Sequence, residues 1–373
     1  MGKGLTSSKR QSNIELLRII SMLMIIAHHV SVYSGFWFSS NDVTAIKLWA
    51  QFIQMGGKIG VDIFVLISGY FMVTNPALNH KKTVKLWLQI VSYSATLYLI
   101  AVLMFDEVLS LNGVLKNFMP ITYSKWWFAG TYFILYLLSP FINKMLNVLD
   151  KKEYRKLLLL MAVCWCIIPS SIKQSVQMNN LLWFVFLYAL AGYIRLHLDI
   201  KRYKSTYCIL GAVIVAGLNY LLTVIFDIWG KEDAFYATYS TYFYEMNMLP
   251  IVVISVLLFI GFLNFDIKYS SFINIVSSAT FGVYLIHENN YIRRFLWETL
   301  FNNRAYGDIS VLIPYTILQI FVVFTACTII ELFRIYCVER IYIGFIDKFL
   351  MLVKGCLRKI CSLNLFNKVK KYL

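Results

Sequence analysis

The chain has 373 residues, of which 59% are hydrophobic and 14% are charged. Its mean hydropathy of +0.66 excludes an ordinary soluble protein, since soluble domains carry about 25% charged residues. The net charge of +16 would suit a nucleic-acid-binding protein, but the basic residues gather in particular loops, as the positive-inside rule expects. Composition therefore indicates a polytopic membrane protein with no nucleic-acid partner.

Apolar stretches separated by polar breaks predict an all-α transmembrane bundle of about ten spans. A polar leader without a small-residue cleavage pattern precedes the first stretch, which is therefore expected to remain as a helix. Most Lys and Arg residues lie in the loops that a cytoplasmic N-terminus places inside, so both termini are predicted to be cytoplasmic. The predicted spans cover residues 14–34, 52–73, 85–105, 127–146, 157–170, 181–196, 206–226, 247–265, 272–288 and 309–333.

The first predicted span carries ionisable groups inside an apolar stretch, where such groups are costly and usually functional. Arg18 and His29 are eleven positions apart, which at about 100° per residue puts both on one helix face, about 16 Å apart. A neutral imidazole can accept a proton from a hydroxyl group. A guanidinium can hold a phosphate or carboxylate. The alternatives are a snorkelling arginine and a buried histidine, His28 or His29, that bonds a neighbouring helix.

The second predicted span places Asp62 in its middle, where an unpaired carboxylate would be protonated or seek a cation. We expect its partner on the first helix. Gly56, Gly57, Gly60 and Gly69 would allow helix 2 to approach a neighbour closely, although some of them are explained by packing alone. Directly inside this span lie His80, Lys81, Lys82 and Lys85, which positive-inside topology explains equally well.

Aromatic and polar residues gather at the outer ends of later spans. Trp126 and Trp127 begin the fourth span, and Tyr242 lies in an aromatic loop before the eighth. Aromatic faces can stack on sugar rings, but an interfacial aromatic belt gives the same composition. His287 and Glu288 end the ninth span, where they either cap the helix or stabilise charge on a substrate.

The last thirty residues, from Gly344, mix apolar with basic side chains. They predict a basic amphipathic helix held at the membrane surface by anionic lipid, so the expected division is a bundle over 1–343 and a tail over 344–373. The seven cysteines fall in predicted spans or cytoplasmic segments, so no disulfide framework is expected. No C-x-x-C pattern predicts a metal site.

Four features occur in order between about residues 12 and 335. They are Arg18 and His29 with ten residues between them, the stretch GVDIFVLISGY at 60–70, Trp127-Phe128 followed by YLLSP at 136–140, and FGVYLIH at 281–287. This combination resembles the acyltransferase-3 family of integral membrane acyltransferases. It is most similar to the short members that O-acetylate bacterial cell-surface polysaccharides.

The resemblance implies a ten-helix bundle that moves an acyl group, commonly acetyl from acetyl-CoA in the cytoplasm, onto a sugar hydroxyl outside. It implies His29 rather than His28 as the catalytic histidine, with Arg18 as the family arginine. Lys82 and Lys85 stand where many members carry an R-x-x-R pair. The positive charge is therefore kept, but the two-point hydrogen bonding of a guanidinium group is lost.

The site residues expected on this basis fall into three groups. They are His29, Arg18 and Asp62 for catalysis, Arg18, Lys82 and Lys85 for the donor, and Trp126, Trp127, Tyr242, His287 and Glu288 for the acceptor. No metal is expected. The expected partners are acyl-CoA, a cell-surface or lipid-linked glycan and membrane lipid, and the expected location is the bacterial plasma membrane.

Two other classes of function remain open from the residues alone. Intramembrane charges and aromatic outer loops would also suit a transporter or flippase of a polyprenyl-linked saccharide. Against it stand a single strongly charged helix and the absence of detectable inverted repeats. A membrane scaffold would leave Arg18, His29 and Asp62 unexplained.

Overall fold

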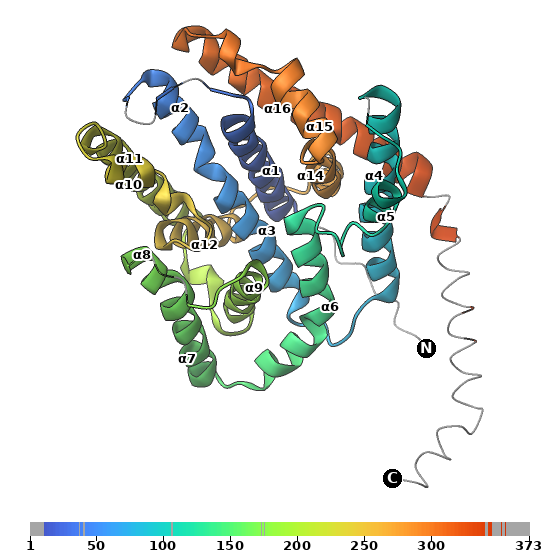
Figure 1. The fold of residues 1–373 in the computed structure, drawn as a ribbon. Coiled ribbons are helices and arrows are strands. Elements are labelled where there is room, and N and C mark those ends of the chain that lie inside the picture. Colours follow the sequence, from blue (N-terminus) through green and yellow to red (C-terminus); the bar gives the residue numbers. More distant parts are fainter. Residues whose placement is uncertain are drawn as a thin grey trace.

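The computed structural model describes residues 11–36, 38, 39, 42–105, 107–172, 174, 176–339, 342–344, 352 and 355. Throughout this part of the chain the regular structure is helical, without a strand (Figure 1). The predicted all-α class is confirmed.

The N-terminal half supplies the two central helices and several helices on both sides of them (Figure 1). Its elements, with η for 3-10 or π-helical segments, are α1 (Ser12–Tyr33), α2 (Ala45–Gln54), α3 (Gly56–Met72), α4 (His80–Met104), α5 (Leu111–Phe118), α6 (Trp127–Val148), α7 (Lys151–Ala162), η1 (Val163–Ile167) and α8 (Ile168–Ile172).

The C-terminal half supplies the remaining helices. They are α9 (Asn180–His197), η2 (Ile200–Arg202), α10 (Ser205–Trp229), α11 (Ala234–Tyr239), η3 (Tyr242–Tyr244), α12 (Leu249–Leu263), α13 (Ser271–Ser278), α14 (Thr280–His287), α15 (Asn290–Arg294), η4 (Phe295–Leu300), η5 (Asn303–Ala305), α16 (Ile309–Phe333) and η6 (Arg334–Val338).

Among the described residues, eight helical segments are long and apolar enough to cross a membrane. Each of the ten predicted spans coincides with helix, but two fall outside this set. The span predicted at 127–146 is α6, and the one at 272–288 is a shorter apolar segment, Ser271–His287. The latter is divided at Ala279 into α13 and α14.

Polar side chains set where many of the helices begin. Asn79 accepts a hydrogen bond from the Lys82 backbone amide at the start of α4, and Asp150 forms a capping box with Glu153 at the start of α7. Such caps satisfy backbone amides that have no partner within the helix. They explain why the apolar helices begin at defined residues.

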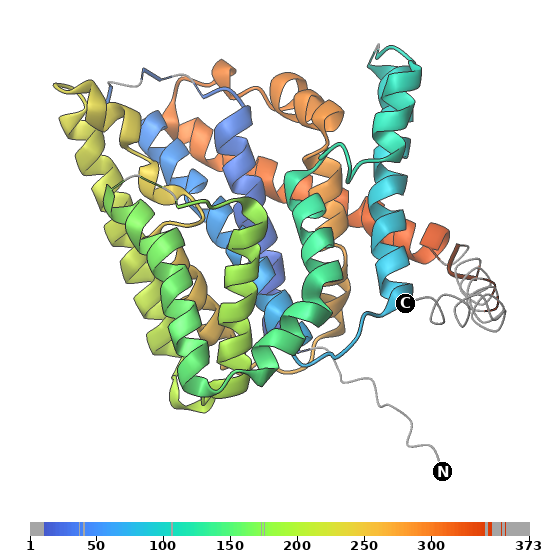
Figure 2. The same cartoon turned by 60° about the horizontal axis from the view of Figure 1, so that its bottom comes forward.

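Helix α3 lies at the centre, packed against α1, α9 and α12. Figures 1 and 2 show α1 and α3 running through the middle, with α10 and α12 on one side and α4 on the other. A Cβ at Gly60 would lie 2.6 Å from the Ser21 carbonyl oxygen, and one at Gly57 would lie 2.4 Å from the His28 Cβ. These two glycines therefore permit α1 and α3 to approach closely.

The amphipathic tail predicted from residue 344 lies outside the described residues, apart from residues 344, 352 and 355. In the described part, the cysteines Cys164, Cys166, Cys208, Cys327 and Cys337 are all free thiols.

Candidate active site

Two histidines from distant parts of the sequence meet at one end of the bundle. His29 lies in the last turns of α1, and His287 is the final residue of α14. Their rings are joined by a contact of 2.9 Å between Nδ1 of His29 and Nε2 of His287. The His287 side chain is fully buried, whereas His29 keeps 12% of its side chain exposed. We call this the His29 end of the bundle.

The hydrogen bonds of His287 fix the proton positions of the pair. Nδ1 of His287 lies 2.6 Å from the Val283 carbonyl oxygen, and a carbonyl can only accept, so this nitrogen carries the proton. In the neutral ring Nε2 of His287 is then an acceptor, and Nδ1 of His29 donates to it. The remaining nitrogen of His29, Nε2, holds a lone pair and bonds no other described residue. His29 is thereby set up as a base.

A carboxylate completes this arrangement. Glu288 Oε2 lies 3.2 Å from Nδ1 of His29, while Oε1 lies 2.9 Å from the Arg293 guanidinium and accepts from the Tyr33 hydroxyl at 3.4 Å. Arg293 also stacks over the Tyr33 ring, 4.5 Å from its centroid. Glu288 follows the apolar segment, and burial raises the pKa of its carboxyl to about 7 despite the opposing effect of Arg293.

His29, His287 and Glu288 could also offer ligand atoms to a metal ion, since these atoms lie within 4.8 Å of one another. The 2.9 Å separation of the two histidine nitrogens is a hydrogen-bond distance. It is shorter than the separation of about 3.3 Å expected for two nitrogens on a tetrahedral zinc ion. The geometry therefore favours a hydrogen-bonded pair over a metal centre.

A cavity of about 250 Å³ runs along α1 between Arg18 and His29. The two residues are eleven positions apart, a rise of about 16 Å, and their presence in one cavity confirms that they share one face of α1. Polar groups from other helices, including Ser68 and Tyr132, line the wall, and Trp127 and Phe128 add apolar surface. This shape suits an extended chain that carries a few polar groups.

Arg18 faces this cavity as a weakly paired cation. Its ion pair with Glu15 is long, at 3.9 Å, and Glu15 is itself held by the Ser277 hydroxyl at 2.5 Å. The buried Nε of Arg18 has no hydrogen-bond partner among the described residues. An unsatisfied buried donor is costly, so the guanidinium is suited to receive an anion or a carbonyl.

A second cavity, of about 510 Å³, lies at the Arg18 end of the bundle. It shares Gln89, Ser278 and Phe281 with the first cavity, so the two adjoin. Lys85 lines this second cavity and pairs with Glu339. Lys82, in contrast, is an exposed residue that lines neither cavity. The structure thus brings Lys85, but not Lys82, to the space that leads towards His29.

A polar pocket of about 260 Å³ opens at the His29 end. It is lined by Tyr33, whose ring lies 5.5 Å from that of His29, together with Trp297, Asn302 and Arg304. The indole N–H of Trp297 is buried and has no partner among the described residues. The pocket therefore offers aromatic, amide and cationic groups, and it begins at Tyr33, about one helical turn beyond the histidine.

Asp62 does not join His29, contrary to the expectation of a partner on helix 1. Its Oδ1 accepts from the Trp183 indole of α9 at 3.1 Å. Gly60 faces α1, and Asp62 follows two residues later, about 200° around the helix. Asp62 therefore points to the opposite side of α3.

The predicted acceptor residues separate into two groups. His287 and Glu288 contact His29, and Trp127 lines the cavity that contains it. Trp126 is 2% exposed and lines neither cavity nor the pocket. The Tyr242 hydroxyl donates to the Pro169 carbonyl at 2.7 Å, where it joins η3 to α8, so the structure does not bring Tyr242 to the site.

Sequence reasoning missed Tyr33, Trp297, Arg334 and Glu339. Arg334 follows Glu331 by three residues at the end of a long apolar run, and such spacing predicts an ion pair on one helix face. That signal was available. For Tyr33 and Trp297 no sequence signal exists, because their importance comes from a pocket that forms only in the folded chain.

Comparison with known proteins gives one family match. A family model described as an acyltransferase domain matches residues 11–332. An amino-acid racemase of Enterococcus faecalis is 24% identical over 168 residues, which are 44% of this chain and 22% of that protein. The match thus spans about a fifth of the length of that relative. No solved structure matches the chain.

Proposed function

Because the chain belongs to the acyltransferase family whose model matches residues 11–332, and is thus a membrane acyltransferase, we propose that it transfers an acetyl group. The proposed donor is acetyl-CoA, and the proposed acceptor is a hydroxyl group of a cell-surface or lipid-linked glycan in a bacterial membrane. Family membership argues against the transporter considered from the sequence.

The observation that carries this proposal is the cavity that ends at His29. It joins a weakly paired guanidinium at one end to a histidine with a free Nε2 at the other. Nucleophilic acyl transfer needs a base of this kind beside the reacting hydroxyl. The cavity gives a thioester arm a path to that base.

Positive-inside topology assigns the Arg18 end to the cytoplasm, where acyl-CoA is available. The donor phosphates would then lie near Arg18 and Lys85, and the thioester would reach His29 through the cavity. The pocket at Tyr33 and Trp297 would hold the sugar, because glycan sites combine aromatic faces with amide and charged groups.

In the proposed reaction Nε2 of His29 takes the proton of the acceptor hydroxyl as its oxygen attacks the thioester carbonyl. The carbon–sulfur bond breaks, and the proton passes from His29 to the leaving thiolate, which gives an ester and a free thiol. The imidazolium formed in between is stabilised by His287 Nε2 and by the Glu288 carboxylate. Attack by His29 itself, to form an acyl-imidazole first, uses the same nitrogen and the same path.

Replacement of His29 tests the proposal, and its neighbour supplies the control. In a host that makes the acceptor, His29→Ala is expected to abolish the O-acetyl signals of the surface polysaccharide in proton NMR. His28 bonds the Gln54 carbonyl at 2.9 Å and lines neither cavity, so His28→Gln at matched membrane level is expected to retain them. Equal acetylation in the intact protein and His29→Ala would remove His29 from the reaction.

A further inference from the structure

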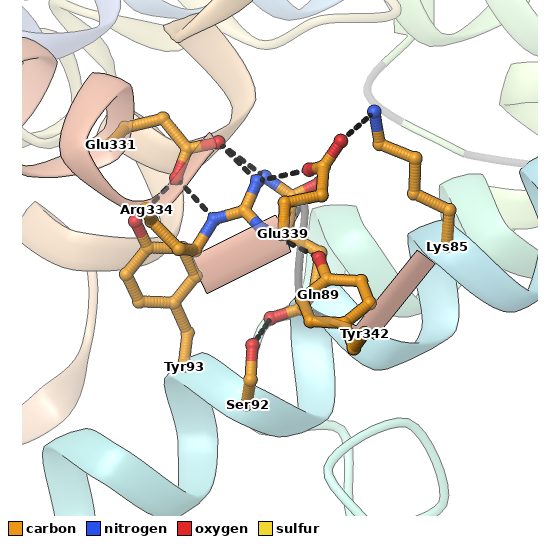
Figure 3. Close-up of polar contacts among 8 residues, drawn as sticks. All are labelled: Lys85, Gln89, Ser92, Tyr93, Glu331, Arg334, Glu339 and Tyr342. Atoms are coloured by element: carbon orange, nitrogen blue, oxygen red, sulfur yellow. Dashed lines mark hydrogen bonds and ion pairs between the residues drawn. The ribbon is translucent and has the colours of Figure 1, made fainter. Parts of the chain in front are cut away.

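Four charged side chains form a chain of ion pairs along the 510 Å³ cavity (Figure 3). Glu331 lies in the last turn of α16, Arg334 begins η6, Glu339 follows η6, and Lys85 lies near the start of α4. Arg334 contacts both carboxylates, and Lys85 contacts Glu339. All four line the cavity.

Glu331 is held firmly within this chain of pairs. Its two oxygens accept from the Gln89 amide at 2.9 Å, from the Tyr93 hydroxyl, and from Arg334 Nε and Nη2 at 2.7 and 2.8 Å. The side chain is 1% exposed. A buried carboxylate with this many donors is fixed, and its two-point contact orients the Arg334 guanidinium.

Glu339 has far fewer contacts. Among the described residues its carboxylate meets two groups, Nη2 of Arg334 at 3.0 Å and the Lys85 ammonium. Lys85 keeps 43% of its side chain exposed, so a solute can reach it. Two cations from different helices therefore converge on one carboxylate at the wall of an open cavity.

The charges of the cluster balance, with two cations and two carboxylates. A phosphate ester carries the same kind of acceptor oxygens as Glu339, and Lys and Arg are the side chains that bind it. It could take the place of Glu339, but it could not bind beside that carboxylate without repulsion between like charges. The ligand and Glu339 would thus compete for the same two cations.

We infer that Lys85 and Arg334 form a binding site for a phosphate ester, which Glu339 occupies until the phosphate displaces it. The inference rests on the proposed function, in which the phosphate belongs to the acyl-CoA donor. The shared wall residues Gln89, Ser278 and Phe281 connect this site with the cavity that ends at His29. Arg334 and Glu339 lie beyond residue 332, where the family match ends.

Calorimetric titration of the purified full-length protein with acetyl-CoA tests this competition. Glu339→Gln keeps the size of the side chain and removes its charge, so the dissociation constant is expected to fall several-fold. Lys85→Gln is expected to raise it several-fold, and Lys85→Arg to restore it. In each of these variants KM for acetyl-CoA is expected to change in the same direction as the dissociation constant.

The matched control is Asp199→Asn, which neutralises an exposed carboxylate paired with Arg202 at 2.9 Å and should leave affinity unchanged. Arg334→Gln would leave the buried Glu331 carboxylate without its cation and could destabilise the fold. The test therefore uses Lys85 and Glu339 instead. Unchanged affinity in both Glu339→Gln and Lys85→Gln, with normal binding to the intact protein, would overturn the inference. Failure of the intact protein to bind acetyl-CoA would overturn the proposed donor as well.

A lipid headgroup carries the same phosphate chemistry, and a second arm separates the two sources. The titration is repeated in nanodiscs of phosphatidylcholine alone and of phosphatidylcholine with phosphatidylglycerol. Equal donor affinity in both, with the Glu339→Gln gain retained, supports the donor phosphate as the occupant. Donor binding that phosphatidylglycerol suppresses in the intact protein, but not in Lys85→Gln, would make the headgroup the occupant and overturn the assignment to the donor.

Discussion

A substitution at Trp297 can distinguish a role in acceptor binding at the pocket from a role in the stability of the fold. Its indole N–H is buried without a partner among the described residues, and an unpaired buried donor costs about 1–3 kcal/mol. Trp297→Phe keeps an aromatic ring and removes this donor. We therefore expect an unchanged or higher unfolding temperature in detergent together with a several-fold higher KM for the glycan acceptor. A variant that loses stability and activity together would show a packing role instead.

The raised pKa of Glu288 predicts how turnover depends on pH. With a pKa of about 7, this carboxyl is neutral below that pH and ionised above it. Only the ionised form stabilises the imidazolium of His29, 3.2 Å away, so the rate is expected to rise as pH increases through about 7. Initial rates measured between pH 5.5 and 8.5 should show this increase, and in Glu288→Gln the rate should no longer depend on pH in this range. If the rate of Glu288→Gln still rose through about pH 7, the pH dependence would belong to another group.

Periodicity predicted some of the site residues and could not predict others. The spacing of Arg18 and His29 places both on one face, because helix geometry is local, and the structure confirms this. The role of His287 as the hydrogen-bond partner of His29 depends on a contact across 258 residues. Nothing in the sequence around either histidine specifies that contact.

At the level of helices, the close contact of α1 with α3 depends on the absence of a side chain at Gly60. At Gly60 a Cβ would lie 2.6 Å from the Ser21 carbonyl oxygen, so Gly60→Ala must push the helices apart. We expect a cost of about 1–3 kcal/mol, seen as a lower unfolding temperature in detergent. At Gly217 in α10 a Cβ meets nothing within 4 Å, so Gly217→Ala should be neutral or stabilising by about 1 kcal/mol. Equal effects at both positions would contradict the close approach.

Hydropathy located the helices but not the breaks within them. The span predicted as continuous over 272–288 is divided at Ala279, where the Thr280 hydroxyl bonds the Ser277 carbonyl at 2.9 Å. Similarly, the face to which Asp62 points could not be predicted, because three helices, α1, α9 and α12, pack against the central α3. Helix breaks and the direction of individual side chains are determined by tertiary packing, and the average hydrophobicity of a segment contains no information about that packing.

At the scale of the whole molecule, the two adjoining cavities predict a single route to His29. Ser278 is half-buried and lines both of them, so Ser278→Trp should obstruct the route and lower the transfer rate from acetyl-CoA at least tenfold. Ser171 is an exposed serine whose hydroxyl also donates to the carbonyl of the preceding turn, as Ser278 donates to Ile275. Ser171→Trp is therefore the matched control and should leave the rate unchanged. Full activity in Ser278→Trp would require another route.

The helical class of the molecule was predictable because composition excludes other classes, and the structure confirms it. The cavities were not predictable, since they arise where α1, α4, α14 and α16 fail to fill the space between them. Lys82 and Lys85 show the difference, because both carry the same charge in the same helix and only Lys85 lines a cavity.

The position of His29 between the cavity that begins at Arg18 and the pocket at Tyr33 has an electrical consequence if the Arg18 end faces the cytoplasm, as proposed. In the proposed reaction the proton of an external hydroxyl leaves on a thiol that returns to the cytoplasm, while the acyl group that moves outward is uncharged. Each turnover therefore transfers one positive charge inward. An inside-negative membrane potential would favour that movement by up to about 2.3 kcal/mol per 100 mV, so an energised membrane would drive acylation forward without any coupling ion.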